Sequence, residues 1–259
     1  MFDIPASDAQ AEQPTVVNVT EGIYCRQEID NLTWMDFGEY LLAVDALEHT
    51  AKADAVFDAI AETSGPKPVR YLLNTHTHYD HVALNDLFVR KWGTEIINAR
   101  TREFPERGIW LEGAGRRAHM LPMPDAHTDE DCIVWVPQDR VLLVGDIFGW
   151  GLIPLTRNVR SDSFAHLVEV YQRLADYQPE HVIPGHGPLC GRAELQRFVE
   201  YLHWLKNECL QAAAENLSDE QAAERIPPPA DMAHWWRFVA WKHNDSLGKM
   251  LKAARNGWL

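Results

Sequence analysis

Six consecutive residues hold four potential metal ligands: His76, His78, Asp80 and His81. They come directly after the largely apolar run Val69–Leu73, and packing alone does not explain a strand that ends in such a cluster. Imidazole and carboxylate together suit zinc, and also iron, copper or nickel. Side chains alternate along an extended chain, so His76 and His78 point the same way, whereas Asp80 and His81 follow where the chain turns. The cluster therefore indicates two adjacent metal positions.

Composition excludes several classes of partner. The chain has 259 residues, 24 Lys and Arg against 38 Asp and Glu, and a formal net charge of −14. This charge argues against binding to nucleic acid or to anionic membrane surfaces, because such binding relies on basic residues. The chain contains no stretch of about 18 uncharged apolar residues, so no transmembrane helix is predicted. The N-terminus resembles no secretory signal and no two of the four cysteines form a CxxC pair, so we expect a cytoplasmic protein with reduced thiols.

Apolar periodicity predicts strands that alternate with helices, which indicates an α/β or α+β class. Residues 1–14 are polar, contain two prolines, and are expected to form a loose arm. We predict strands at 16–19, 22–25, 40–45, 69–73, 95–98, 133–136, 141–144 and 181–183. We predict helices at 50–63, 82–92, 162–176, 193–216 and 231–254, with a short helix after the capping pattern that begins at Ser218.

Three later segments add candidate ligands of the same kind. His127, Asp146 and His186 each follow directly after a small residue, which lets the backbone pass close to a metal. Asp146 and His186 also come at the ends of predicted strands, as His76 does. Active sites of open α/β sheets usually lie at strand ends, so we expect these side chains to gather at one place.

In these motifs the chain resembles the metallo-β-lactamase superfamily of metallohydrolases. The family's HxHxDH motif is matched by residues 76–81, and its later motifs appear in the same order as Ala126-His127-Thr128, Gly145-Asp146 and Pro184-Gly185-His186-Gly187. Asp45, at the end of an apolar strand, resembles the family's early aspartate, although a turn residue is an equally good reading. Tyr79, Trp110 and Phe148, near these motifs, are expected to serve in packing.

The resemblance implies an αββα sandwich, in which two mixed β-sheets lie face to face with helices outside. Residues 15–259 would form this single domain, with a helical extension from about residue 193. It also implies a dinuclear site with two Zn²⁺, or with iron or manganese. His76, His78 and His127 would hold the first metal; Asp80, His81 and His186 the second; and Asp146 would bridge them. A metal-bridging hydroxide would then attack a small-molecule substrate, and Asp80 would pass a proton to the leaving group.

Departures from the family pattern narrow the function. Some true β-lactamases have Arg at the position of His81, and they have Cys or Ser at that of Asp146. The segment Ala126–Asp131 departs from the GHTPG of common glyoxalases and lactonases. The chain therefore resembles the general hydrolase branch, which acts on an ester, thioester, lactone or amide. The alternatives are an iron-dependent oxidoreductase of the persulfide type, a β-lactam hydrolase, and a binding protein with a vestigial site.

Two residues outside the ligand motifs are candidates for substrate contact. Trp150 lies just beyond Asp146 between two glycines, where pocket wall and core are equally good readings, and His119 lies near His127 in the sequence. In segment 231–254, Trp235, Phe238 and Trp241 recur at helical spacing, which is typical of a buried face, with a lid over the pocket as the alternative.

Overall fold

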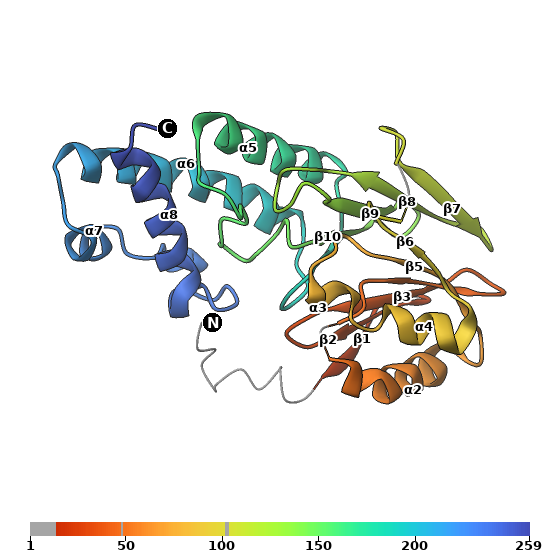
Figure 1. Ribbon diagram of the computed structural model, residues 1–259. Coiled ribbons are helices and arrows are strands. Elements are labelled where there is room, and N and C mark those ends of the chain that lie inside the picture. The colour runs from red at the N-terminus through yellow and green to blue at the C-terminus, as the bar shows by residue number, and fades with distance from the viewer. Residues whose placement is uncertain (1–13, 48, 102–103) are drawn as a thin grey trace.

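The computed structural model describes residues 14–47, 49–101 and 104–259, and its strands form two sheets (Figure 1). The first sheet has six strands in chain order: β1 (Thr15–Thr20), β2 (Ile23–Gln27), β3 (Leu32–Asp36), β4 (Leu41–Val44), β5 (Val69–Leu73) and β6 (Glu95–Ile97). Neighbours from β1 to β4 are antiparallel, whereas β4, β5 and β6 are parallel to one another. The first sheet is therefore mixed.

The second sheet is also mixed. Its five strands run in the order β11 (His181–Pro184), β10 (Val141–Gly145), β9 (Cys132–Val136), β8 (Arg116–Pro122) and β7 (Ile109–Gly113). Only the pair β10 and β11 is parallel, and the connection between them carries a helix. Parallel neighbours need such a crossover, whereas antiparallel ones can be joined by a short turn.

Helices cover the outer faces of both sheets (Figure 1). The helical elements are η1 (Thr50–Lys52), α2 (Ala53–Ser64), α3 (Tyr79–Val82), α4 (Asn85–Trp92), α5 (Ser161–Asp176), α6 (Arg192–Ala214), α7 (Asp219–Arg225), η2 (Ala230–Met232), η3 (Phe238–Lys242) and α8 (His243–Arg255). Helices α2 and α4 pack on the first sheet, and α5, α6 and α8 pack beside the second.

Alternation of apolar side chains along single strands produces these layers. In β4, Leu42 and Val44 belong to the core between the sheets, whereas Leu41 and Ala43 belong to the core under α2 and α4. Strand β10 repeats the arrangement, with alternate residues in the inter-sheet core and in the core under α5 and α6. The predicted αββα sandwich of two mixed sheets is confirmed.

Three strands escaped the sequence analysis, and each has a physical reason. Strand β3 is buried along most of its length, so it lacks the polar alternation that marks a half-exposed strand. Strands β7 and β8 carry charged side chains, including Arg116 and Arg117, and β7 is the edge of its sheet. Edge strands are more polar than central ones, which weakens their apolar signal.

The prediction of one continuous helix over residues 231–254 is wrong. The segment forms the 3₁₀ turn η2, the π-helical turn η3 and the α-helix α8. Arg237 lies between η2 and η3 with a φ of 57°, a left-handed conformation that an α-helix does not continue through. The regular spacing of aromatic residues that suggested a single helix therefore spans η2, η3 and α8.

Two of the aromatic side chains in this segment belong to the core. Trp235 and Phe238 are buried in the cluster that also contains Phe148 of the loop after β10. Trp236 takes another position and packs on the metal-site side, where a Cβ added to Gly187 would lie 2.6 Å from its ring. The core reading therefore holds for Trp235 and Phe238, and Trp236 contacts the loop that carries His186.

Other expectations fall partly outside the described residues. The arm predicted at residues 1–14 lies there except for Pro14 and stays a prediction. Within the described part of the chain, the helices are too short or too polar to cross a membrane. The four cysteines are free thiols, three of them buried.

A matched pair of leucines on α6 tests whether the C-terminal helices share one cooperative unit with the sheets. Leu205 is fully buried in the core that also contains strand β10, whereas Leu210 is 38% exposed. We expect Leu205→Ala to lower the free energy of unfolding by about 2–5 kcal/mol, because it leaves a cavity. We expect Leu210→Ala to change it by only about 0.5 kcal/mol.

Urea denaturation followed by far-ultraviolet circular dichroism measures both variants. Since a single domain unfolds in one transition, the whole curve of Leu205→Ala should shift to lower urea. A separate early transition for the C-terminal helices, with the sheets unaffected, would contradict the prediction of one domain over residues 15–259.

Candidate metal centre

Strand ends from both sheets bring the candidate ligands to one place. Strand β5 leads into the loop with His76 and His78. The short helix α3 then carries Asp80 and His81. The remaining candidates come from the second sheet: His127 lies between β8 and β9, and Asp146 and His186 follow β10 and β11. The structure thus gathers all seven predicted ligands.

The seven side chains form two groups that share one carboxylate. The first group is His76, His78, His127 and Asp146; the second is Asp80, His81, Asp146 and His186. Within each group the potential ligand atoms all lie within 4.8 Å of one another. The grouping matches the division expected from the family resemblance, with residues able to hold a metal on both sides of Asp146.

Asp146 lies between histidines of both groups. Its Oδ2 atom is 3.6 Å from His127 Nε2 and 4.0 Å from His76 Nε2, both of the first group. Its Oδ1 atom is 3.3 Å from His81 Nε2 and 3.2 Å from His186 Nε2, both of the second group. One carboxylate can therefore serve both groups at once.

Oxygen atoms outside the cluster fix the orientation of three histidine rings. His81 Nδ1 lies 3.0 Å from Asp45 Oδ2, and His127 Nδ1 lies 2.8 Å from the Pro154 carbonyl oxygen. His186 Nδ1 lies 3.0 Å from the Ile29 carbonyl oxygen. An Nδ1–H that donates to such an oxygen leaves the Nε2 lone pair directed into the cluster. His78 differs, since its Nδ1 atom is the one that faces the cluster, 3.1 Å from His127 Nε2.

The residues fit a metal by two criteria. First, His76 Nε2 is a buried atom that makes no hydrogen bond within the described residues. Buried polar atoms without a hydrogen bond are rare because they cost free energy, and a metal ion would satisfy this one. Second, the ligand set combines imidazole nitrogens and carboxylate oxygens, the donors that zinc and non-haem iron accept.

Without metal ions, histidines of the first and second ligand groups differ in their protonation. Burial lowers the pKa of His76 to about 2, so this ring is neutral and its lone pair is available. Burial also acts to lower the pKa of His81, but the charges of Asp45 and Asp146 outweigh it and raise the pKa to about 10. The pKa of His186 is likewise raised well above its ordinary value, mainly by Asp146. Protons on these two rings offset the buried carboxylates.

Asp45 holds both the first ligand loop and a ligand. Its carboxylate accepts hydrogen bonds from the Thr75 backbone N–H at 2.8 Å and from the Thr75 hydroxyl at 2.9 Å. The same carboxylate lies 3.0 Å from His81 Nδ1. Asp45 is 4% exposed and has a φ of 58°. The structure therefore gives Asp45 a place beside the ligands rather than in an exposed turn.

Two residues that support the site were missed in the sequence. The Asn31 amide donates to the carbonyl oxygens of Pro184 and Gly187, at 2.9 and 2.8 Å, and so braces the loop that carries His186. The Asp131 carboxylate accepts from the His127 backbone N–H at 2.6 Å and closes the loop around that ligand. Asn31 lies in a turn, where an asparagine is common for local reasons and gives no signal.

Gly185 shows why a small residue precedes a ligand. A Cβ at this position would lie 2.2 Å from Asp146 Oδ1 and 2.7 Å from His81 Cε1. Both distances are far below van der Waals contact. The backbone before His186 thus passes so close to the cluster that a side chain would displace its central carboxylate.

Neither candidate for substrate contact lines the pocket beside the cluster. Trp150 is 6% exposed and packs edge-on against Phe148 and Trp235, so it belongs to the core. His119 stacks on Trp110 with ring centroids 4.0 Å apart. Trp110 is itself 44% exposed and Tyr79 is 65% exposed, so neither belongs to the core, whereas Phe148 is buried as expected. Substrate contact by Trp150 or His119 stays a prediction that these positions do not support.

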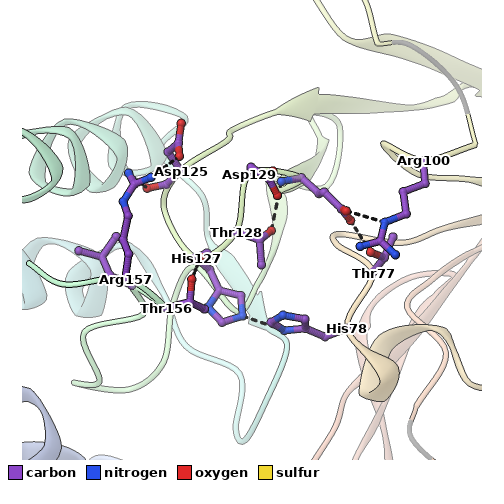
Figure 2. A pocket seen from close by; sticks show the side chains of 11 residues that line it. Thr77, His78, Arg100, Asp125, His127, Thr128, Asp129, Thr156 and Arg157 are labelled. Carbon is purple, nitrogen blue, oxygen red and sulfur yellow. Dashed lines mark hydrogen bonds and ion pairs between the residues drawn. The ribbon is translucent and has the colours of Figure 1, made fainter.

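A pocket of about 430 Å³ opens beside the first group. Figure 2 shows His78 and His127 facing each other, with Arg157 and Asp125 on one side and Arg100 and Thr77 on the other. The lining is mostly polar. A small molecule in this pocket would lie against two of the candidate ligands.

Removing one charge from Asp45 tests its role beside the ligands. We expect Asp45→Asn to lower metal affinity by about 10–100-fold, because the residue that orients a ligating histidine affects the metal nearly as much as the ligand does. Titration of zinc against a competing chromophoric chelator measures the affinity. Asp58→Asn on the exposed face of α2 is the matched control and should bind as the wild type does. Equal affinities in both variants would contradict the prediction.

Comparison with known proteins finds one family whose sequence model matches part of this chain. A model described as the metallo-beta-lactamase superfamily matches residues 34–122. The matched range contains His76, His78, Asp80 and His81, and it ends before the three later ligands. The sequence match therefore covers the opening motif, and the structure supplies the rest.

Solved structures share the fold at low sequence identity. The stereoselective inverting sec-alkylsulfatase Pisa1 from Pseudomonas sp. has a TM-score of 0.70 and 14% identity over 96% of this chain, which spans 51% of that protein. A metallo-beta-lactamase from Pontibacter korlensis has a TM-score of 0.59 and 16% identity, covering 74% of this chain and 99% of that one. A chemotaxis sensor, ODP, in a peroxy diiron form, has a TM-score of 0.58 and 13% identity, covering 73% and 94%.

The three observations agree: the family model covers the opening motif, the sheets and helices have the family's architecture, and the ligand motifs meet in one cluster. The chain therefore has the metallo-β-lactamase fold, and the model of that superfamily matches its residues 34–122.

Proposed function

We propose that the protein is a dinuclear zinc hydrolase that acts on a small ester, thioester, lactone or amide. The observation that carries the proposal is the position of Asp146, which lies within ligand distance of histidines in both groups. A carboxylate shared in this way suits two neighbouring metals. The pocket beside His78 and His127 supports a small-molecule substrate.

The two groups divide the ligands as expected from the sequence. His76, His78 and His127 would hold the first ion, and Asp80, His81 and His186 the second, with Asp146 between them. When bound, a metal pair would polarise the substrate oxygen and lower the pKa of a water molecule. The protein contributes by holding seven side chains in place before the ions arrive.

Asp80 is the proposed proton carrier. Burial alone would raise its pKa, but the hydrogen bond from His186 and the nearby His81 lower it to about 2. The side chain keeps 27% of its surface exposed, whereas that of His81 keeps 1%. An ionised, accessible carboxylate at this place is positioned to relay a proton between a water molecule and a leaving group.

The comparisons support hydrolysis without naming the substrate. The alkylsulfatase and the β-lactamase are hydrolases by name, yet the chain spans about half the length of the former. Identities of 14% and 16% carry the fold and not the specificity. For this reason we propose the bond class from the metal groups and leave sulfate esters and β-lactams as substrates to be assayed.

Removal of single ligands tests the proposal. We expect His76→Ala and Asp146→Ala to abolish turnover while leaving the fold largely intact, since the core of this chain does not depend on either side chain. Asp146→Ala should also lower the bound metal from two ions per chain to fewer than one, because Asp146 serves both groups. The measurements are metal content by plasma mass spectrometry, circular dichroism, and initial rates on a panel of lactones, thioesters, sulfate esters, β-lactams and persulfides.

The control is His203→Ala, an exposed histidine on α6 that should keep wild-type rates and metal content. Full activity of a metal-analysed His76→Ala protein would contradict the proposal. A rate loss shared by His203→Ala would show that the loss has no connection with the metal groups.

An iron-dependent oxidoreductase of the persulfide type is the second candidate. The observation that favours it is the ligand set of histidine and carboxylate, which also suits iron. Metal analysis separates the two functions. Two zinc ions per chain with lactone or thioester turnover support the hydrolase, and a single iron with persulfide oxidation supports the alternative.

A further inference from the structure

We propose that the pocket beside His78 and His127 binds a neutral, polyhydroxylated part of the substrate. The proposal rests on the hydrolase function above and gives its substrate class. The pocket has a volume of about 430 Å³, within the about 300–1,000 Å³ of ordinary small-molecule sites. A ring of monosaccharide size fits that space.

The lining offers little to an alkyl chain. Leu155 is the single apolar residue among the eleven that line the pocket. Burying an alkyl group gains free energy in proportion to the apolar surface that it covers, so one leucine contributes little. The other side chains are polar and would lose contact with water without a partner on the ligand.

The charges of the lining disfavour an anion. Arg157 already pairs with Asp125 at 2.6 Å (Figure 2). Arg100 pairs with Glu130 at 2.5 Å. Asp129 adds a third carboxylate, so two guanidinium groups face three acidic groups and the balance is 2 − 3 = −1. Away from His78 and His127, a carboxylate or sulfate in the pocket would meet no unpaired arginine and would approach three like charges.

The threonine hydroxyl groups of the lining can act towards a ligand only as acceptors, because each already donates its hydrogen within the protein. Thr77 donates to Glu130, Thr128 to Asp131, and Thr156 to the carbonyl oxygen of His127. Each hydroxyl has one hydrogen to donate and keeps acceptor capacity afterwards, part of which Thr128 uses for the Glu130 backbone N–H at 3.2 Å. The Asp129 carboxylate is a further acceptor in the lining.

A ligand that satisfies this lining must therefore bring several donors. Ammonium and hydroxyl groups both do so, but metal ions held by His78 and His127 would repel an ammonium group nearby. Neutral hydroxyl groups remain, and several on one small ring match the several acceptors around the pocket.

Three probes with the same six-membered ring test the inference by binding alone. They are 1,5-anhydroglucitol, which carries hydroxyl groups; tetrahydropyran, which carries none; and piperidine, which is cationic at neutral pH. We expect the zinc-loaded protein to bind anhydroglucitol at least about tenfold more tightly than either of the others, since each net hydrogen bond contributes about 0.5–1.5 kcal/mol. Ligand-observed NMR titration measures the three dissociation constants.

Rates of lactone hydrolysis provide a second test. For each lactone, kcat/KM is divided by the rate constant of the uncatalysed hydrolysis, which corrects for intrinsic reactivity. We expect this ratio to be about tenfold or more higher for glucono-δ-lactone than for δ-valerolactone. Asp129→Ala should reduce both this preference and the affinity for anhydroglucitol. Asp58→Ala, on the exposed face of α2, should leave both unchanged.

The outcomes separate this inference from the proposed function. Equal or tighter binding of tetrahydropyran or piperidine would overturn the polyol inference, even if the protein hydrolyses lactones. If the protein hydrolyses no substrate of the panel, the hydrolase proposal fails, and the binding comparison still decides what the pocket accepts. Preference for valerolactone would overturn the inference and keep the hydrolase.

Discussion

The buried carboxylate of Asp146 is the contact on which the metal centre depends. It lies 3.2–4.0 Å from four histidines that come from both sheets, at a depth where an uncompensated charge is costly. Three of those histidines, His81, His127 and His186, are in turn held by Asp45, Pro154 and Ile29 on the outer side. Positive charge, whether from protons or from metal ions, is what allows this carboxylate to stay buried.

Backbone hydrogen bonds keep the strand ends around Asp146 together. Cys132 N–H donates to Thr75 O across the two sheets at 2.7 Å, and Gly185 N–H donates to Gly145 O at 2.8 Å. Asn31 adds a third connection, from the turn after β2 to Gly185 O. The ligand loops thus belong to the rigid sheets, which places the ligand atoms before any ion binds and reduces the conformational entropy lost on binding.

Much of this arrangement could be predicted from the sequence, because metal ligands are few residue types in short motifs. The run Val69–Leu73 and the cluster after it were predicted with their bounds, since a buried strand and a ligand loop both leave local patterns. Asn31, Asp131 and the exposure of Trp110 could not be predicted, since each depends on which segments meet in three dimensions. The break at Arg237 was missed for the same reason: its left-handed backbone is set by packing around it, not by its own side chain.

The division of the ligands between the two sheets has a consequence for how the protein is made. Each group takes two members from the segment 76–81 and two from residues 127–186. A nascent chain that has formed only the first sheet therefore offers neither group complete. An ion captured early would meet at most a pair of neighbouring ligands and would leave easily. The first group is complete only when residue 146 has emerged from the ribosome, and the second only when residue 186 has, so loading of both groups reports that the two sheets have paired.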